Sequence, residues 1–373
     1  MFRLFKKKTV EIEEIRVEEK VKQDKRRKTL PKELKQLIEN NNIEDIKKLY
    51  KKCRENAYDT FTENNVLCYR DLSEELIRWF IEQGCDINYV GRWKKTPLHY
   101  QASYYENHVQ LYLDLGANIE ALDYMEQTPL HYATDSKSLN NVKTLVESGA
   151  NIYAKEKLNK LTPIEFMLLR GYPMDLPKMY EIVLYLLEKG NKITDSMKDS
   201  IIRIGKDFEF HKSNMAIDTK DIEEYLYRFY KLFDVTPVEQ RKIYDGVSLI
   251  IPKSQRWQDI HEELWDLLVP SQGHASTIQG EVVRINGKVS HEILGNGACN
   301  WDEDYKEMIK SLLTYLSAGI SLSDELIEEV RSLIRVISLG DGDKELNRLA
   351  EISVIWILDN PKPILLDKVD YKR

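Results

Sequence analysis

The pentapeptide TPLHY occurs twice in this 373-residue chain, at residues 96–100 and again at residues 128–132. A sequence that returns at a period of roughly 20 to 50 residues is the signature of stacked supersecondary units. Such a unit cannot bury its apolar face alone, so its neighbours must stack on it. The repeat therefore predicts a solenoid of similar units in this part of the chain.

Each predicted unit begins with a helix-starting signal and ends with a glycine turn. A threonine hydroxyl can cap the free N–H groups of a helix, and proline suits the first helical position because the N–H it lacks would have had no partner. Glycine reaches the left-handed conformation that ends a helix at no steric cost. The three openings are Thr96-Pro97-Leu98-His99, Thr128-Pro129-Leu130-His131 and Thr162-Pro163-Ile164-Glu165. The turns are Gly84-Cys85-Asp86-Ile87-Asn88, which closes an upstream unit without this opening, Gly116-Ala117-Asn118-Ile119, Gly149-Ala150-Asn151-Ile152 and Gly190-Asn191-Lys192-Ile193.

Two complete openings and four turns at nearly constant spacing resemble the ankyrin repeat family. The resemblance implies an ankyrin solenoid over residues 30–195. It also implies that His99 and His131 tie the start of each first helix to the neighbouring turns. Residues 30–52 read as two short helices joined at residues 40–42, as an N-terminal capping repeat would.

The sequence also departs from the pattern of this family. Lys94, Glu126 and Lys160 stand where the family usually has glycine, so we expect less regular turns. Glu165 replaces the histidine in the third unit. Residues 171–177 belong to an additional segment of that unit, and we expect an extended loop between its two helices. This loop is either a recognition element or a tolerated insertion.

Ankyrin domains act as binding scaffolds, and the resemblance implies contacts from the turn tips and the adjacent helix starts. The tip candidates are Arg92, Trp93, Lys95, Tyr124, Met125, Gln127, Leu158 and Asn159, and Tyr104 and Asp135 would lie beside them on first helices. Tryptophan, tyrosine, methionine and arginine are enriched at protein interfaces. The alternative is that Trp93 and Tyr124 pack on their own neighbours.

Residues 196–373 show helical spacing and no strand alternation, so we expect a separate α-helical C-terminal domain and an all-α chain. Apolar residues recur every three or four positions through residues 277–294, which predicts a helix despite Gly280 and Gly287. Each of these glycines costs about 1 kcal/mol relative to alanine. They share a face with Arg284, so we expect another backbone to approach that face closely. Residues 323–337 and 343–358 predict two further helices.

Polar residues near this glycine-containing helix raise the question of catalysis. The members of this possible C-terminal site are Gln279, Glu281, Arg284, His291 and Asn300. The alternative is a ladder of opposite charges along one helix face, in which Glu281 and Arg284 continue through Lys288 to Glu292. The chain has no complete HExxH, Walker or GxSxG motif and no GxGxxG fingerprint. We therefore expect no catalytic residue, no cofactor and no metal ligand.

Charge and cysteine usage limit the class of partner. The net charge is −7, and the first 30 residues hold 11 Lys or Arg against six Asp or Glu, which leaves −12 on the remainder. An acidic body is a poor nucleic-acid binder. Four cysteines without a CxxC pair argue against a zinc ribbon or a redox motif, and we expect free, buried thiols.

The basic head, residues 1–29, offers a further alternative. Phe2, Leu4 and Phe5 beside three lysines could touch anionic lipid, although we favour a solvated tail. The sequence has neither a signal-peptide core nor a run of about 20 apolar residues, so we expect a cytoplasmic protein.

The function expected from these observations is protein binding without chemistry. The resemblance to plain bacterial ankyrin proteins implies an immunity protein that neutralises a toxin, since such proteins frequently have this role. The acidic body would suit a basic toxin domain, because complementary electrostatic potentials speed the encounter of two proteins. Residues 268–316 resemble uncharacterised bacterial proteins, which favours a bacterial or phage source without implying an activity. The alternatives are a phage or bacterial modulator of a defence complex, a scaffold or effector, and an enzyme whose activity lies in the C-terminal domain.

Overall fold

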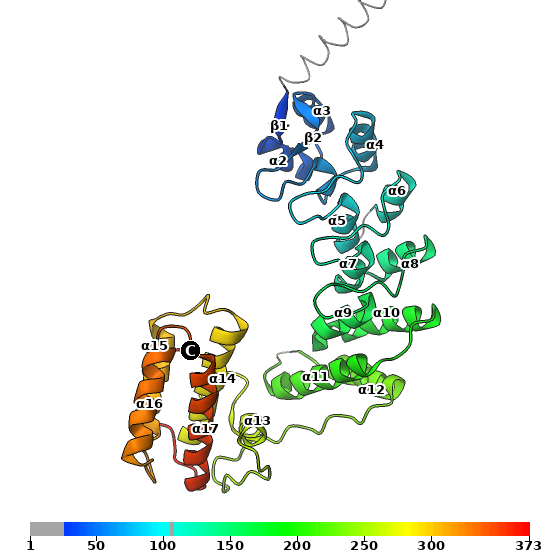
Figure 1. Cartoon of the computed structure of the whole chain (residues 1–373). Coiled ribbons are helices and arrows are strands. Elements are labelled where there is room, and N and C mark those ends of the chain that lie inside the picture. Colours follow the sequence, from blue (N-terminus) through cyan, green and yellow to red (C-terminus); the bar gives the residue numbers. More distant parts are fainter. Residues whose placement is uncertain (1–25, 105–107, 216) are drawn as a thin grey trace, which may run out of the picture. The chain divides into compact units, whose positions relative to one another are not determined.

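The computed structural model describes residues 26–104, 108–215 and 217–373 (Figure 1). These residues form two compact units. The first comprises the described residues up to Gly205 together with Thr219–Pro237, and the second comprises Lys206–Asp218 and Val238–Arg373. The possible lipid-binding residues of the basic head, Phe2, Leu4, Phe5 and Lys6 to Lys8, lie outside the described residues.

The first unit begins with the two short helices expected from the sequence, α2 (Glu33–Glu39) and α3 (Ile43–Tyr50). The side chain of Asn42 caps α3 by accepting a hydrogen bond from the Asp45 backbone N–H. Two strands, β1 (Arg27–Thr29) and β2 (Cys53–Tyr58), flank the helices and pair in parallel. The sequence predicted no strand here, because β1 has only three residues and the six residues of β2, CRENAY, do not alternate between apolar and polar.

Pairs of helices then repeat along the first unit. The first members, α5, α7 and α9, stack on one another, and the second members, α6, α8 and α10, form a parallel layer (Figure 1). Leu98 and Leu130, which follow the prolines of two openings, are fully buried between them. The bounds are η1 (Val66–Cys68) with α4 (Glu74–Glu82), α5 (Pro97–Ser103) with α6 (Val109–Asp114), α7 (Pro129–Asp135) with α8 (Leu139–Glu147), and α9 (Pro163–Arg170) with η2 (Pro173–Asp175) and α10 (Leu176–Glu188).

The additional segment of the third unit extends the connection between the two helices only slightly, from residues 136–138 in the preceding unit to residues 171–175. Helix α10 has 13 residues where α8 has nine, so most of the added residues lengthen the second helix. The short 3-10 helix η2 occupies most of the connection. Leu176 and Met179, at the start of α10, are fully buried. The added segment is thus only partly in the core, because Tyr172 and Met174 are 65% and 58% exposed.

The first unit continues beyond the repeats recognisable in the sequence. Helix α11 (Asp195–His211) begins in this unit and ends in the second one. Helix α12 (Lys220–Phe233) packs on α10, where the ring of Tyr180 lies edge-on against Phe229 at 5.1 Å between centroids. The short 3-10 helix η3 (Lys212–Asn214) follows α11.

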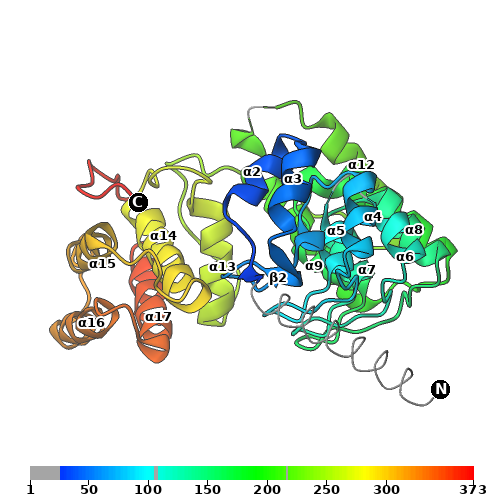
Figure 2. The same cartoon turned by 90° about the horizontal axis from the view of Figure 1, so that it is seen from above.

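The second unit is a cluster of helices around α14 (Ile278–Ser290), which contacts α13 (Trp257–Leu268), α15 (Glu303–Tyr315) and α17 (Asp343–Asp359) (Figure 2). Helix α14 continues as one π-helical turn, η4 (His291–Gly295), and α16 (Asp324–Ile337) packs on α17. The helices expected at 277–294, 323–337 and 343–358 are thus confirmed. The all-α class is confirmed as well, apart from the two short strands of the first unit.

The two glycines of α14 allow α13 to approach closely. A Cβ atom at Gly280 would lie 3.1 Å from the backbone oxygen of Leu268 and 2.8 Å from the Cβ of Ala275. A Cβ atom at Gly287 would lie 2.1 Å from the ring of Trp265. The expected backbone approach is therefore confirmed at Gly280 but wrong at Gly287, where an indole ring takes up the space.

The cysteines are all free, and three of them are buried. Cys299 is exposed, against our expectation, because it lies in the turn between η4 and α15. No group of His, Cys, Asp and Glu within the described residues could hold a metal ion. Among residues 26–104, 108–215 and 217–373, no helix combines the length and the apolar character needed to cross a membrane.

Candidate functional site

Four hairpins project from the repeats of the first unit, at residues 59–64, 91–95, 123–127 and 156–161, and together we call them the hairpin strip. A carboxylate holds the shape of three of them. In the third, Asp123 Oδ1 accepts hydrogen bonds from the backbone N–H groups of Met125 and Gln127, at 2.8 and 2.9 Å. Asp59 and Glu156 bind backbone N–H groups of their own hairpins in the same way. Hydrogen bonds within the chain therefore fix the conformation of these three hairpins, and no bound partner is needed.

The hairpins keep a regular turn although they lack the usual glycine. Glu63, Lys94, Glu126 and Lys160 occupy equivalent positions, and all have φ between 57° and 59°. Hydrogen bonds such as Lys94 N–H to the Gly91 carbonyl, at 3.0 Å, close these turns. Our expectation of less regular turns is wrong because the surrounding hydrogen bonds impose the left-handed conformation on residues that enter it only at a cost.

Adjacent hairpins are joined by backbone hydrogen bonds. The N–H of Arg92 donates to the Thr62 carbonyl at 2.9 Å, and the N–H of Tyr124 donates to the Trp93 carbonyl at 3.0 Å. A third bond runs from Lys157 N–H to the Met125 carbonyl at 2.8 Å. The strip is consequently one continuous surface.

Large apolar side chains project from this strip into solvent. Trp93 is 50% exposed, Tyr124 is 59% exposed and Leu158 is 71% exposed. The ammonium group of Lys157 lies 5.5 Å from the centre of the Tyr124 ring. Packing on neighbours, the alternative for Trp93 and Tyr124, therefore covers only about half of either side chain. The assignment of these residues to an interface stays a prediction.

The other tip candidates have defined contacts. Arg92 forms an ion pair with Glu63 at 2.9 Å, and Asn159 is exposed. Lys95 lies 4.8 Å from the ring centre of Tyr132. Met125 and Gln127 are half-buried and lend backbone groups to the hydrogen bonds of the strip.

The structure separates two candidates from the hairpins. Tyr104 follows the last residue of α5, and Asp135 is the last residue of α7, so both lie at the opposite end of the first helices from the hairpins. The Tyr104 hydroxyl donates to the Cys68 carbonyl at 3.3 Å. Asp135 pairs with Arg170 at 3.1 Å. Both side chains thus have structural roles within the solenoid.

An aromatic row on the first helices escaped the sequence analysis. Tyr100, Tyr132 and Phe166 occupy the position directly after His99, His131 and Glu165, and all three are half-buried. Lys95 contacts the faces of the first two rings, which joins this row to the hairpin strip. The sequence contained a signal for this row, because Tyr100 and Tyr132 are the fifth residues of the two TPLHY pentapeptides.

The two histidines have the bridging role that the family resemblance implied. In the opening of α5, His99 Nδ1 lies 3.0 Å from the Thr96 backbone nitrogen, and Nε2 lies 3.0 Å from the Gln127 carbonyl of the next hairpin. His131 repeats this arrangement with Thr128 and Leu161. Burial lowers the pKa of His99 to about 4 and also lowers the pKa of His131. Both rings are therefore neutral structural groups at pH 7.

Comparison with known protein families agrees with this geometry. Residues 65–156 match the family model of ankyrin repeats, described as three copies. The chain contains ankyrin repeats. The matched residues cover the helix pairs that begin with η1, α5 and α7, and the ankyrin repeats of other proteins are protein–protein interaction modules. No curated protein matches this chain.

Beyond the ankyrin repeats, the structure divides the possible C-terminal site into separate groups. Gln279 is fully buried, donates to the carbonyls of Asn360 and Lys362, and accepts from the N–H of Ile364. It therefore holds the segment after α17 against α14. Its side chain takes no part in the contacts of Glu281.

Asn300 belongs to another group. Its backbone N–H and its side-chain amide both donate to the carboxylate of Glu292, at 2.6 and 3.3 Å. The side-chain amide of Asn296 donates to the same carboxylate. Glu292 is 3% exposed, so these contacts organise the turn that follows η4.

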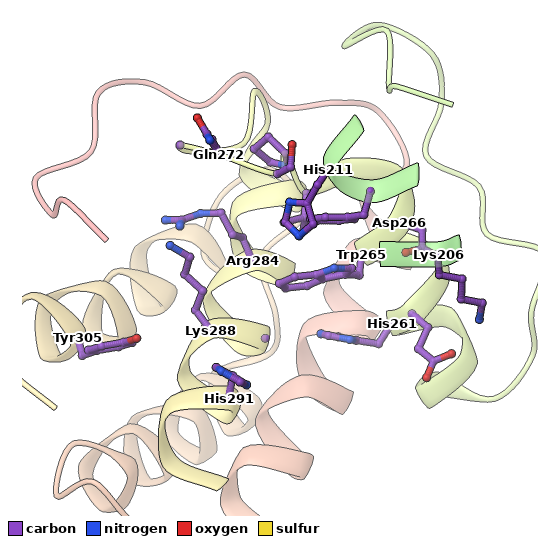
Figure 3. Close-up of a pocket in the computed structure, with 17 residues that line it drawn as sticks. Lys206, His211, His261, Trp265, Asp266, Gln272, Arg284, Lys288, His291 and Tyr305 are labelled. Atoms are coloured by element: carbon purple, nitrogen blue, oxygen red, sulfur yellow. The ribbon is translucent and has the colours of Figure 1, made fainter. Parts of the chain in front are cut away.

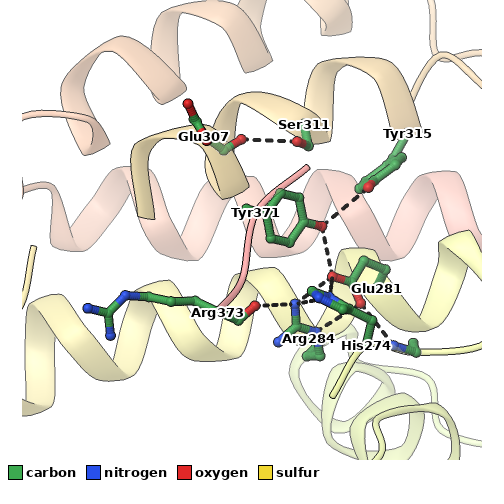
Figure 4. A network of polar contacts seen from close by, with 9 residues as sticks. His274, Glu281, Arg284, Glu307, Ser311, Tyr315, Tyr371 and Arg373 are labelled. Atoms are coloured by element: carbon green, nitrogen blue, oxygen red, sulfur yellow. Dashed lines mark hydrogen bonds and ion pairs between the residues drawn. The ribbon is translucent and has the colours of Figure 1, made fainter. Parts of the chain in front are cut away.

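Glu281 and Arg284 form a buried ion pair, with 0% and 1% of the side chains exposed (Figure 4). Arg284 Nε donates to Glu281 Oε2 at 2.8 Å, and the Tyr371 hydroxyl donates to Glu281 Oε1 at 2.7 Å. Burial would raise the pKa of Glu281, but Arg284 and the other donors outweigh burial and hold the pKa below its usual value. The first pair of the expected charge ladder, Glu281 with Arg284 three residues later, is therefore present, and it is buried.

A cleft of about 850 Å³ lies in the second unit, between α13 and α14 (Figure 3). His291 lines it together with Arg284, so the structure brings these two members of the possible site to one cavity. The sequence analysis did not assign the remaining lining residues to a site. Among them are His261, Trp265, Lys288 and Tyr305.

Proposed function

We propose that this protein binds another protein through the hairpin strip of its ankyrin repeats, without catalysing a reaction. The family match supports an interaction module. The exposure of Trp93, Tyr124 and Leu158 on consecutive, hydrogen-bonded hairpins is the observation on which the proposal rests. Rigid aromatic side chains that are already exposed lose little conformational freedom on binding, and such residues dominate interface energies.

Acidic and cationic residues are balanced within the strip. Asp123 and Glu156 are buried, at 6% and 2% exposure, by the hydrogen bonds that they accept. The exposed charged residues of the strip are Arg92, Lys94, Glu126, Lys157 and Lys160. Arg92 already pairs with Glu63, and the whole strip holds five cationic and five acidic residues, so its net charge favours neither sign of charge in a partner.

A narrower proposal is a bacterial, cytoplasmic immunity protein that neutralises a toxin domain. The net charge of −7 supports a basic toxin, but the exposed charges of the strip do not. A basic toxin would therefore have to engage acidic surface elsewhere on the chain. The neighbouring genes distinguish these roles. An immunity protein predicts a toxin gene directly beside its own gene, whereas a modulator of a defence complex or a scaffold does not.

Affinity measurements on the full chain test the proposal. A pull-down from the native host supplies the partner, and the double variant Trp93→Ala/Tyr124→Ala should then weaken binding by about 2 kcal/mol or more. Tyr227→Ala is the matched control, because Tyr227 is 53% exposed and lies on α12, outside the strip. If both variants keep the affinity of the unaltered chain, the strip is not the binding surface.

A further inference from the structure

The cleft between α13 and α14 contains a buried arginine with an unused donor. Arg284 is 1% exposed, and its Nε and Nη2 atoms donate to Glu281 and to the Arg373 carbonyl. Its Nη1 atom makes no hydrogen bond with any residue that the structure describes, although the side chain lines the cleft. A buried donor without an acceptor destabilises the folded state, so its presence calls for an explanation.

A second cation stands beside this donor. Lys288 lies one helical turn after Arg284 on α14, is half-buried and lines the same cleft (Figure 3). Within the described part of the chain, no carboxylate forms an ion pair with Lys288. Burial lowers the pKa of its ammonium group and the charge of Arg284 lowers it further, although the charge of Glu281 acts in the opposite direction. Two neighbouring cations of this kind would be stabilised by an anion in the cleft.

Histidines from both helices also line the cleft. The Nε2 atom of His261, on α13, is buried and makes no hydrogen bond among the described residues. His291 lines the cleft from the start of η4. The carboxylates of the cleft, Glu262 and Asp266, come from α13, and Asp266 lies across Trp265 from Arg284 (Figure 3).

The floor of the cleft is apolar and already in place. The rings of Trp265 and Phe210 are stacked, with centroids 6.1 Å apart and planes inclined by 13°. Trp265 reaches the surface of α14 only because residue 287 is glycine. The cleft volume, about 850 Å³, is typical of a small-molecule site.

We propose that this cleft binds a small molecule with a phosphate group, whose oxygens accept hydrogen bonds from Arg284 Nη1 and Lys288 Nζ. The remainder of the molecule lies against Trp265. A phosphate matches several converging donors better than a carboxylate, because it offers three terminal oxygens, and arginine and lysine are its usual partners. This site is independent of the hairpin strip, so either proposal can fail without the other.

Calorimetry of the full chain with phenyl phosphate tests this assignment, since the probe combines a phosphate with one ring. We expect saturable binding, and we expect Lys288→Gln to weaken it about tenfold or more. Lys310→Gln, which removes the same charge from an exposed position of α15 outside the cleft, should leave binding unchanged. The proposal is overturned by an absence of binding, or by equal effects of the two lysine variants.

Two further measurements sharpen the result. Arg284→Lys keeps a positive charge beside Glu281 but removes Nη1, and its fold can be verified by circular dichroism. A folded Arg284→Lys variant should also bind phenyl phosphate about tenfold more weakly. Benzoate should bind more weakly than phenyl phosphate, and equal affinity for the two probes would contradict a phosphate site.

Discussion

The carboxylate of Glu165 accepts a hydrogen bond from the hydroxyl of Thr194, at 2.8 Å, and thereby joins α9 to the residue that precedes α11. The other oxygen accepts from the backbone N–H and the hydroxyl of Thr162, at 3.0 and 2.8 Å. His99 makes the same two kinds of contact, to its own helix start and to the next unit. The carboxylate thus replaces the histidine, and the repeat architecture continues beyond residues 65–156.

Replacement of Glu165 by alanine should lower the free energy of unfolding by about 1 to 3 kcal/mol, because a helix cap and a bond between units are both lost. Glu165→His should retain most of the stability, since histidine fills this position in two other units. Urea denaturation followed by circular dichroism measures both variants. Glu181→Ala, at an exposed position of α10, should stay within about 0.5 kcal/mol of the unaltered chain. Equal stability of Glu165→Ala and Glu181→Ala would refute the bridging role.

Stability should fall as the pH falls from about 6.5 to 4, because His99 is neutral in the folded protein. Its folded pKa is about 4, whereas an unfolded histidine has a pKa near 6.5. Below pH 6.5 the unfolded chain binds a proton that folded His99 does not, so unfolding becomes easier. At pH 5, the proton that only the unfolded chain binds lowers the free energy of unfolding by about 2 kcal/mol. The pKa of His131 is also lowered by burial, so this histidine should likewise reduce the stability of the folded protein as the pH falls.

Urea denaturation at pH 7 and pH 5 measures this dependence. His99→Gln should be less stable at pH 7 and should lose less stability on acidification. The exposed histidine His211, changed to glutamine, is the control and should keep the full dependence. The burial account fails if His99→Gln shows the same pH dependence as the unaltered chain.

The ankyrin part was predictable because its signals are local. Threonine and proline at a helix start, and glycine at a helix end, act within one turn of the chain, so Thr96 and Gly116 can be read without knowledge of distant contacts. The left-handed conformation of Lys94 could not be read in this way. Hydrogen bonds of its hairpin impose that conformation, whereas the sequence shows only the absence of the usual glycine.

The buried pair in the second unit could not be predicted for a related reason. A spacing of three residues between Glu281 and Arg284 fits an exposed ladder and a buried ion pair equally well. The difference comes from Tyr371, which lies 90 residues after Glu281 and donates to its carboxylate. No local pattern in the sequence relates these two positions. The cleft was missed as well, because its lining comes from α11, α13, α14 and α15, which no single sequence pattern brings together.

Substitution of glycine for Lys160 should stabilise the protein by about 0.5 to 1 kcal/mol. Its φ of 57° is unfavourable for a residue with a Cβ atom, and glycine removes that cost although it gains freedom in the unfolded chain. Thermal denaturation of Lys160→Gly measures the effect. Lys157→Gly in the same hairpin lies outside the left-handed positions and should be neutral or destabilising. Destabilisation by Lys160→Gly would mean that the lysine side chain has a role in the hairpin that outweighs the backbone strain.

Replacement of Glu281 by glutamine should destabilise the second unit by about 3 to 5 kcal/mol, because it leaves the charge of Arg284 buried without a counter-charge. Tyr371→Phe removes one donor to the carboxylate and should cost about 1 kcal/mol. Urea denaturation followed by tryptophan fluorescence compares both with Glu303→Gln, whose partner Lys306 lies at the surface and whose pair should contribute little. If Glu281→Gln proved as stable as Glu303→Gln, water would have to reach the pair in solution.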